Sequence, residues 1–206
     1  MEVKEEQMTQ VEGAAAGKPG KEKKPLNVKK EILSWILTIA VAVAAALLIR
    51  TFLFEPIRVD GESMCDTLQD GEIMLVTKPE YLFGDPQRGD VVICKYPGRT
   101  ENFVKRVMGI PGDVIEIRSN VVYRNGEALD EPYLTPERND NGSSMAPFTL
   151  GEDEYFVMGD NRDNSHDSRN YYTNSYPPTP AALTRDMIIG HVRCVVFPFS
   201  DIRTIE

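Results

Sequence analysis

The chain has 206 residues and a formal net charge of −9, a length that allows one or two domains and one hydrophobic core. The charge is uneven, because residues 1–30 carry seven lysines against five glutamates and the part from Thr51 onward therefore carries about −11. Such an acidic domain argues against binding nucleic acid through its phosphates. Three widely spaced cysteines without a C-x-x-C pair, and only two histidines, give no sign of a metal site or a cofactor.

The N-terminal part predicts a tail followed by a membrane anchor. Residues 1–30 are polar and lack aromatic side chains, which is typical of a disordered segment. Ile32 to Ile49 contains no charged residue, and with Phe52-Leu53 it gives about 22 residues, or roughly 33 Å of helix. That length spans a hydrocarbon core of about 30 Å, so we expect a transmembrane helix at 31–54.

A cleaved signal peptide is the main alternative for this run, because Ala42-Val43-Ala44 resembles a cleavage site. The apolar run continues past that site through Leu47-Leu48-Ile49, which favours an uncleaved anchor. The lysines that precede the run place the N-terminus in the cytoplasm and residues 55–206 outside the plasma membrane.

Residues 55–206 predict a mainly β domain with an antiparallel sheet. Short runs rich in Val, Ile, Tyr and Phe are separated by Gly, Pro, Asp and Asn, and Asn125-Gly126 predicts a type I′ hairpin turn. Residues 118–154 contain a polar, turn-rich part and predict a small inserted cap. Residues 171–180 predict a second loop-like excursion from the sheet. The runs that we expect to be strands are 72–78, 90–95, 102–108, 113–117, 121–123, 155–158 and 188–197.

The first stretch of chemical interest surrounds Ser63, which follows Gly61-Glu62 and precedes Met64-Cys65-Asp66-Thr67-Leu68. A serine hydroxyl is a poor nucleophile until a base removes its proton. Taken alone, Ser63 reads as an ordinary turn residue. The neighbouring Cys65 thiol is a less favoured alternative nucleophile.

The second stretch contains two adjacent cations, Lys105 and Arg106, in a strand that is otherwise apolar on both faces. Because side chains alternate along a strand, one of the two should point into an apolar environment. Burial disfavours the ammonium form and can lower a lysine pKa by up to about 3–5 units, which makes the amine a general base. The alternative is an edge strand whose two cations both extend to water.

The third stretch, Gly159 to Arg169, holds three aspartates and two arginines. A calcium loop is disfavoured because Ser168 and Asn174 stand where a glycine and an acid are expected. A Ser165-His166 catalytic pair is disfavoured because adjacent residues on an extended chain point apart. The remaining interpretation is a loop of ion pairs in which Ser165 orients a base and Asp167 pairs with an arginine.

Together the three stretches resemble the characteristic boxes of type I signal peptidases, which are membrane-anchored serine-lysine proteases that remove signal peptides from exported proteins. The resemblance runs from the basic tail to the C-terminal strand, and the order and spacing match as well. The matching boxes are Gly61–Met64, Arg88–Val92, Val104–Asp113 and Gly159–Arg169.

The resemblance implies that Ser63 is the nucleophile and Lys105 the general base of a Ser-Lys dyad. Ser165 matches the serine that hydrogen-bonds to the lysine amine and orients it. The other supporting residues match a network of ion pairs, formed by Asp160, Arg162, Asp167 and Arg169.

The resemblance also implies the substrate, which is a preprotein with small residues one and three positions before the cut. Its extended segment would add as a strand beside the strands that carry Ser63 and Lys105, close to the lipid bilayer. The residues expected to line the substrate pockets are Val59, Gly61, Met64, Leu68 and Val104.

Two residues depart from the family pattern. Asp66 stands where the family usually has proline, and Gly61 stands where Gram-negative members carry a serine that contributes to the oxyanion hole. Gly61 and the short, singly anchored chain resemble the Gram-positive branch. Two rival functions are a self-cleaving Ser-Lys repressor, disfavoured by the anchor, and an inactive membrane-tethered binding module, favoured only by Asp66.

Overall fold

The structure is a computed structural model that describes residues 28–96, 99–169 and 182–205. The expected tail at 1–30 and the excursion at 171–180 therefore lie largely or wholly outside the described residues.

Helix α1, Val28–Phe52, is the one helix in the described ranges that is long and apolar enough to cross a membrane. Its sequence is rich in Ala, Leu, Ile and Val, and an 18-residue window within Val28–Ile49 has a mean hydropathy of 2.7. The Thr38 hydroxyl donates a hydrogen bond to the Ser34 carbonyl, so this polar group is satisfied within the helix. These properties are consistent with the expected anchor.

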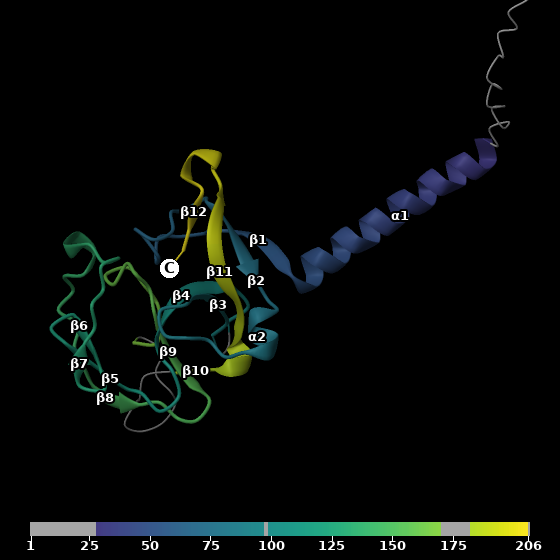
Figure 1. Ribbon diagram of the computed structural model, residues 1–206. Coiled ribbons are helices and arrows are strands. Elements are labelled where there is room, and N and C mark those ends of the chain that lie inside the picture. The colour runs from purple at the N-terminus through teal and green to yellow at the C-terminus, as the bar shows by residue number, and fades with distance from the viewer. Residues whose placement is uncertain (1–27, 97–98, 170–181, 206) are drawn as a thin grey trace, which may run out of the picture. The chain divides into compact units, whose positions relative to one another are not determined.

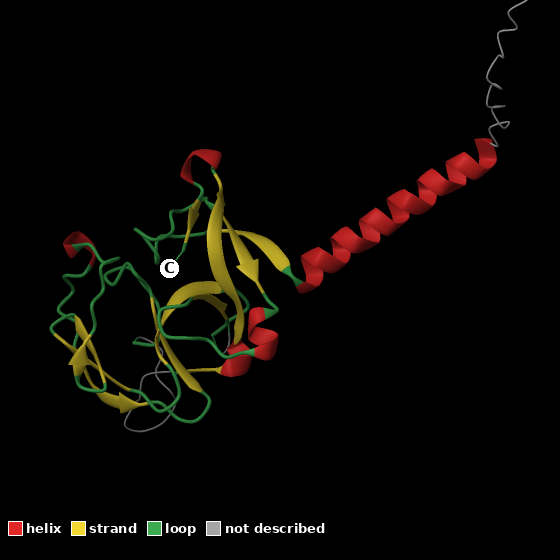
Figure 2. Ribbon diagram, viewed as in Figure 1, coloured by secondary structure: helices red, strands yellow, loops and turns green. Residues whose placement is uncertain are grey.

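The rest of the described chain is mainly β, as the sequence predicted (Figures 1 and 2). The larger sheet is antiparallel and has the strand order β1-β2-β11-β3-β4-β9-β10, with β12 paired to β11. Its strands are β1 Phe54–Arg58, β2 Ile73–Thr77, β3 Val91–Cys94, β4 Phe103–Gly109, β9 Glu154–Met158, β10 Leu183–Thr184, β11 Ile188–Phe197 and β12 Arg203–Thr204.

The smaller sheet has the order β7-β6-β5-β8, and Figure 1 shows it on the left. Its strands are β5 Val114–Arg118, β6 Val121–Arg124, β7 Glu127–Ala128 and β8 Met145–Thr149. Asn125 and Gly126 both have positive φ, 54° and 87°, where they join β6 to β7, so the expected hairpin is confirmed. We propose that the inserted cap expected at 118–154 corresponds to this sheet, whose first strand already begins at Val114.

All seven expected strands are present with small shifts of their ends, and two strands of five residues were missed. β1 contains Pro56, which lacks an N–H group, and it lies at the edge of its sheet, where such a residue is tolerated. β8 lies at the edge of the smaller sheet and contains Pro147. The helical elements of the domain are short: α2 Glu80–Phe83 and the 3₁₀ turns Pro136–Arg138, Arg185–Met187 and Phe199–Asp201.

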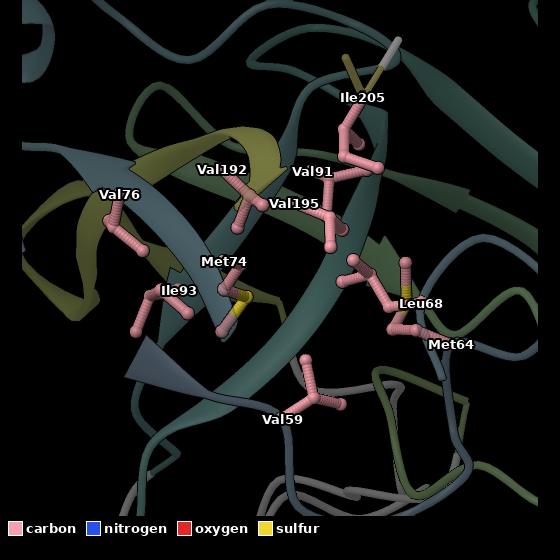
Figure 3. Close-up of a cluster of buried hydrophobic side chains, with 10 residues drawn as sticks. All are labelled: Val59, Met64, Leu68, Met74, Val76, Val91, Ile93, Val192, Val195 and Ile205. Carbon is pink, nitrogen blue, oxygen red and sulfur yellow. The ribbon is translucent and has the colours of Figure 1, made fainter. Parts of the chain in front are cut away.

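Strand β3 is buried on both faces, and this explains its continuous apolar run. Val91 and Ile93 belong to one hydrophobic cluster, shown in Figure 3, and Val92 and Cys94 belong to a second cluster. The first cluster also includes Met64 and Leu68, so the turn that follows Ser63 is packed into the core. A third cluster joins the two sheets, with Met108, Ile115, Ile117, Val122, Leu150, Phe156 and Met158.

Asp113 links three parts of the chain at the start of the smaller sheet. Its carboxylate accepts two hydrogen bonds from Arg88 at 2.7 and 2.8 Å, one from the Ile110 N–H and one from the Asn125 amide. Burial alone would raise the pKa of Asp113, but these donors, above all Arg88, lower it to about 2.

We predict that Asp113→Asn lowers the free energy of unfolding at pH 7 by about 1–2 kcal/mol. Because the folded-state pKa is depressed, the stabilisation is present above the unfolded pKa near 3.8 and is lost as the pH falls towards 2. Denaturant unfolding at several pH values measures this, with the exposed Asp130→Asn as control. Parallel curves for Asp113→Asn and the wild type between pH 4 and 2 would contradict it.

Candidate active site

Ser63 lies in the turn between β1 and β2, and the residues on either side fix its position. Gly61 has a φ of +98°, which favours glycine, and its N–H donates to Asp70 at 2.9 Å. On the other side, Met64 and Leu68 are buried in the core. The Ser63 carbonyl accepts a hydrogen bond of 3.1 Å from the Asn161 N–H. The serine is thus held through its backbone, and its residue remains partly exposed.

Lys105 lies on β4, a central strand between β3 and β9, and is only 1% exposed. Its Nζ lies 2.7 Å from Ser63 Oγ and 2.8 Å from the Val104 carbonyl oxygen. Arg106, on the opposite face of the strand, is 3% exposed. The alternative of an edge strand with two cations in water is therefore wrong.

Burial lowers the pKa of Lys105, because removing water destabilises the ammonium form. The nearby acidic groups Cys94, Asp167 and Asp160 act in the opposite direction, and burial prevails. The Phe103 ring, with its centroid 5.8 Å from Nζ, forms part of the dry surroundings. A lysine in this setting gives up its proton more readily than a lysine in water.

The loop from Gly159 to Arg169 contacts the backbone around Ser63. The Asn161 amide group donates to the Glu62 carbonyl at 3.0 Å, beside the bond from the Asn161 N–H to Ser63. Gly159 has no side chain, and a Cβ there would lie 2.4 Å from the Ser63 carbonyl oxygen and 2.3 Å from Ser165 Oγ. Only glycine permits this close approach of loop and turn.

Of the expected network, one ion pair is formed within this loop, between Arg169 and Asp167, whereas Asp160 and Arg162 pair with residues outside the loop. Arg169 donates to both carboxylate oxygens of Asp167 at 2.8 Å. Arg106 donates to both oxygens of Asp160 at 3.0 and 2.8 Å, and the Thr67 hydroxyl also donates to Asp160. Burial alone would raise the pKa of Asp167, but the hydrogen bonds and the charge of Arg169 lower it.

Ser165 departs from the expectation that it binds the lysine amine. Its hydroxyl is buried and, within the described residues, has no hydrogen-bond partner of ordinary geometry. It lies near enough to Asp167 to help lower the pKa of that carboxyl group. The Lys105 amine is instead held by Ser63 and by the Val104 carbonyl.

A groove of about 400 Å³ opens beside Ser63 and Lys105. Four of the five expected lining residues border it: Val59, Gly61, Met64 and Val104. Leu68 does not, because it is fully buried in the core cluster. The sequence interpretation missed several apolar side chains of the groove, which come from four strands: Ile57, Met74, Ile93 and Phe103. Phe103 could have been found, because strand alternation puts it on the same face as Lys105.

Asp66 and Cys65 follow the candidate nucleophile. The Asp66 carboxylate lies 3.3 Å from Nε of Arg138, and both side chains are partly exposed. The Cys65 thiol is in a buried residue, and burial raises its pKa, which disfavours the reactive thiolate. Of the groups around this turn, the Ser63 hydroxyl is therefore better suited to act as a nucleophile.

Comparison with known proteins gives consistent similarities. Residues 32–197 match the family model described as signal peptidase, peptidase S26. The chain is 38% identical over 189 residues to signal peptidase I of Bacillus licheniformis, covering 88% of this chain and 97% of the relative. It is 38% identical to signal peptidase I S of Bacillus subtilis, covering 86% and 96%. A crystal structure of a signal peptidase I from Enterococcus faecalis matches 52% of this chain and 97% of that chain, with 30% identity and a TM-score of 0.41.

We predict that Lys105→Met raises the free energy of unfolding at neutral pH by roughly 1 kcal/mol, because it removes a buried ionisable group. The pKa of Lys105 is lower in the folded state, so the penalty of burying it applies below the unfolded pKa near 10.5 and fades as the pH approaches that value. Unfolding measured from pH 6 to 10 tests this, with the exposed Lys95→Met as control. A Lys105→Met variant that is less stable than wild type at every pH would contradict the prediction.

Proposed function

Because the chain belongs to the signal peptidase I family, peptidase S26, we propose that it cleaves preproteins after a small-x-small sequence with Ser63 as nucleophile and Lys105 as general base. The observation that carries the proposal is the 2.7 Å separation of Nζ and Oγ at a lysine that is 1% exposed. A base must lie within hydrogen-bond reach of the proton that it takes, and its pKa should lie near the working pH. The geometry and the direction of the pKa shift support both requirements.

The substrate would bind as an extended strand in the groove beside Ser63. The groove lies between residues 57–61, which include the end of β1, and residues 102–105, which include the start of β4. β1 is the edge of the larger sheet, so one side of it is available for pairing. Buried apolar side chains such as Val59 and Met64 leave room for a small residue such as alanine at the cleavage site.

In the first half of the reaction, Ser63 Oγ attacks the carbonyl carbon of the scissile peptide while its proton moves to the neutral Nζ of Lys105. The ammonium group then gives this proton to the leaving amine of the mature protein as the C–N bond breaks. The signal peptide remains as an ester on Ser63.

In the second half, Nζ takes a proton from water as the water oxygen attacks the ester. The C–O bond to Ser63 breaks, Nζ returns the proton to Oγ, and the signal peptide leaves as a carboxylic acid. The backbone N–H of Ser63 is a candidate donor to the oxyanion of both tetrahedral intermediates. Gly61 has no hydroxyl to assist, so a second donor would be another amide or a water molecule.

We propose that α1 crosses the plasma membrane with the N-terminus in the cytoplasm, which would place the groove near the outer surface where signal peptides emerge. This proximity would reduce the entropy lost on binding a membrane-inserted substrate. The rival of an inactive module loses its support, because Asp66 is accommodated beside Arg138 while Ser63 and Lys105 remain in contact.

We predict that Ser63→Ala and Lys105→Met each reduce the cleavage rate of a preprotein with alanine at positions −1 and −3 by roughly 10⁴- to 10⁶-fold. The assay uses the full chain in detergent and detects the mature protein by mass spectrometry. The exposed Ser144→Ala and Lys95→Met are matched controls, and Cys65→Ser should retain activity. Cleavage by Ser63→Ala at the wild-type rate would refute the proposed dyad.

The pH dependence follows from the direction of the Lys105 shift. The reactive form is the neutral amine, so kcat/KM should rise tenfold per pH unit at low pH and level off above the pKa of Lys105. Because burial lowers that pKa, we expect the midpoint well below 10.5. Initial rates from pH 5 to 10, corrected for folded protein, measure it, and a midpoint at or above 10.5 would exclude a desolvated lysine base.

A further inference from the structure

Arg162 is a buried cation inside the loop that holds the candidate nucleophile. It follows Asn161, whose N–H and amide group bind the Ser63 and Glu62 carbonyls. Its own Nε donates to the Gly159 carbonyl at 3.0 Å, and its side chain is 1% exposed. An arginine remains charged when buried and therefore requires a negative partner.

Neither of the buried aspartates of the same loop serves as the direct ion-pair partner of Arg162. Asp160 binds Arg106 through both oxygens, and Asp167 binds Arg169 in the same way. The carboxylate that meets Arg162 belongs to Glu131, which receives one hydrogen bond from Nη2 and one of 3.2 Å from Nη1. The Glu131 side chain is 7% exposed. Burial alone would lower the pKa of Arg162, and Glu131 raises it.

Tyr133 connects this pair to the strand that carries Lys105. Its hydroxyl donates to Glu131 at 2.7 Å, and its ring lies against the guanidinium of Arg106, 3.9 Å from the ring centroid. Arg106 is the neighbour of Lys105 on β4 and binds Asp160 of the loop. Glu131 and Tyr133 therefore contact both the loop behind Ser63 and the strand of the base.

Both residues come from the segment after β7, within the predicted cap. The next part of that segment reaches the same loop, since the Asn141 amide donates to the Arg162 carbonyl at 2.9 Å and the Asp140 N–H donates to Asp163. The cap thus supplies ion-pair and hydrogen-bond partners to the catalytic half of the domain.

We propose that Glu131 is a positioning residue for the Ser63/Lys105 dyad, assisted by Tyr133, and that the cap thereby completes the active site. The inference rests on the proposed function. Glu131 contacts neither reacting atom in the structure. It keeps Arg162, and with it the Asn161 contacts to Ser63, in the arrangement that places Oγ beside Nζ.

The test uses Glu131→Gln, which keeps the size of the side chain and removes its charge. We expect kcat for preprotein cleavage to fall about 10- to 100-fold while KM changes less than about twofold, since small misplacements of reacting groups have effects of this size. Values of kcat are normalised to folded protein, so a loss of stability alone does not change them. Glu127→Gln, an exposed glutamate on β7, is the matched control and should keep the wild-type kcat.

A second variant guards against the case in which Glu131→Gln does not fold. Tyr133→Phe removes the hydroxyl contact to Glu131 and a longer one of 3.8 Å to Met108 Sδ, and it keeps the ring against Arg106. We expect its normalised kcat to fall about threefold to tenfold with unchanged KM. Wild-type kcat in folded Glu131→Gln, or in Tyr133→Phe if the first variant does not fold, would overturn the inference.

The Ser63→Ala variant distinguishes a failure of the positioning proposal for Glu131 from a failure of the proposed function. If Ser63→Ala abolishes cleavage and Glu131→Gln leaves normalised kcat unchanged, only the positioning role is wrong. If cleavage persists in Ser63→Ala, the dyad itself is wrong.

Discussion

The contact between Lys105 Nζ and Ser63 Oγ depends on one constraint, which is that the amine must be kept from water while the hydroxyl remains open to a groove. β4 meets the first requirement because it lies between β3 and β9, so a side chain from its middle cannot reach solvent along an edge. The turn after β1 meets the second, because Met64 and Leu68 are buried and leave Ser63 at the border of the groove. Desolvation lowers the lysine pKa, and the short distance makes that shift useful for proton transfer.

Removal from water also destabilises the charged side chains near Lys105, and each arginine among them is paired with a carboxylate. Two buried arginines and one partly buried arginine each face a carboxylate: Arg106 faces Asp160, Arg162 faces Glu131, and the partly buried Arg169 faces Asp167. Such pairs add little net stability, but removal of one partner leaves a buried charge and costs about 3–5 kcal/mol. Their main consequence is geometric, because they hold the loop from Gly159 to Arg169 against the turn that contains Ser63. Thr67, which donates to Asp160, joins that turn to the network directly.

The β character of the domain was predictable from local patterns, because strand alternation and turn residues act over a few positions. The apolar faces of β4 indicated burial of Lys105 or Arg106 without deciding between them, and the pairing of Lys105 with Ser63 followed from the family resemblance. Contacts that depend on the order of the strands within the sheets could not be predicted from local sequence patterns. Leu68 was assigned to the groove although it packs into the core, and Glu131 was overlooked because no spacing rule links it to Arg162, 31 positions away. The Ser165 hydroxyl shows a further limit, since the resemblance predicted a hydrogen bond to the lysine that is not formed.

Titration of the Lys105 amine itself is the most direct test of a neutral lysine beside a serine. With ¹⁵N-labelled lysine in the full chain, the Nζ resonance can be assigned by its loss in Lys105→Met and followed by NMR as the pH is varied. Desolvation at this position predicts that the resonance titrates well below 10.5 in the folded protein. A midpoint at or above 10.5 would mean that the amine is protonated at working pH, and it would contradict the role of Lys105 as general base.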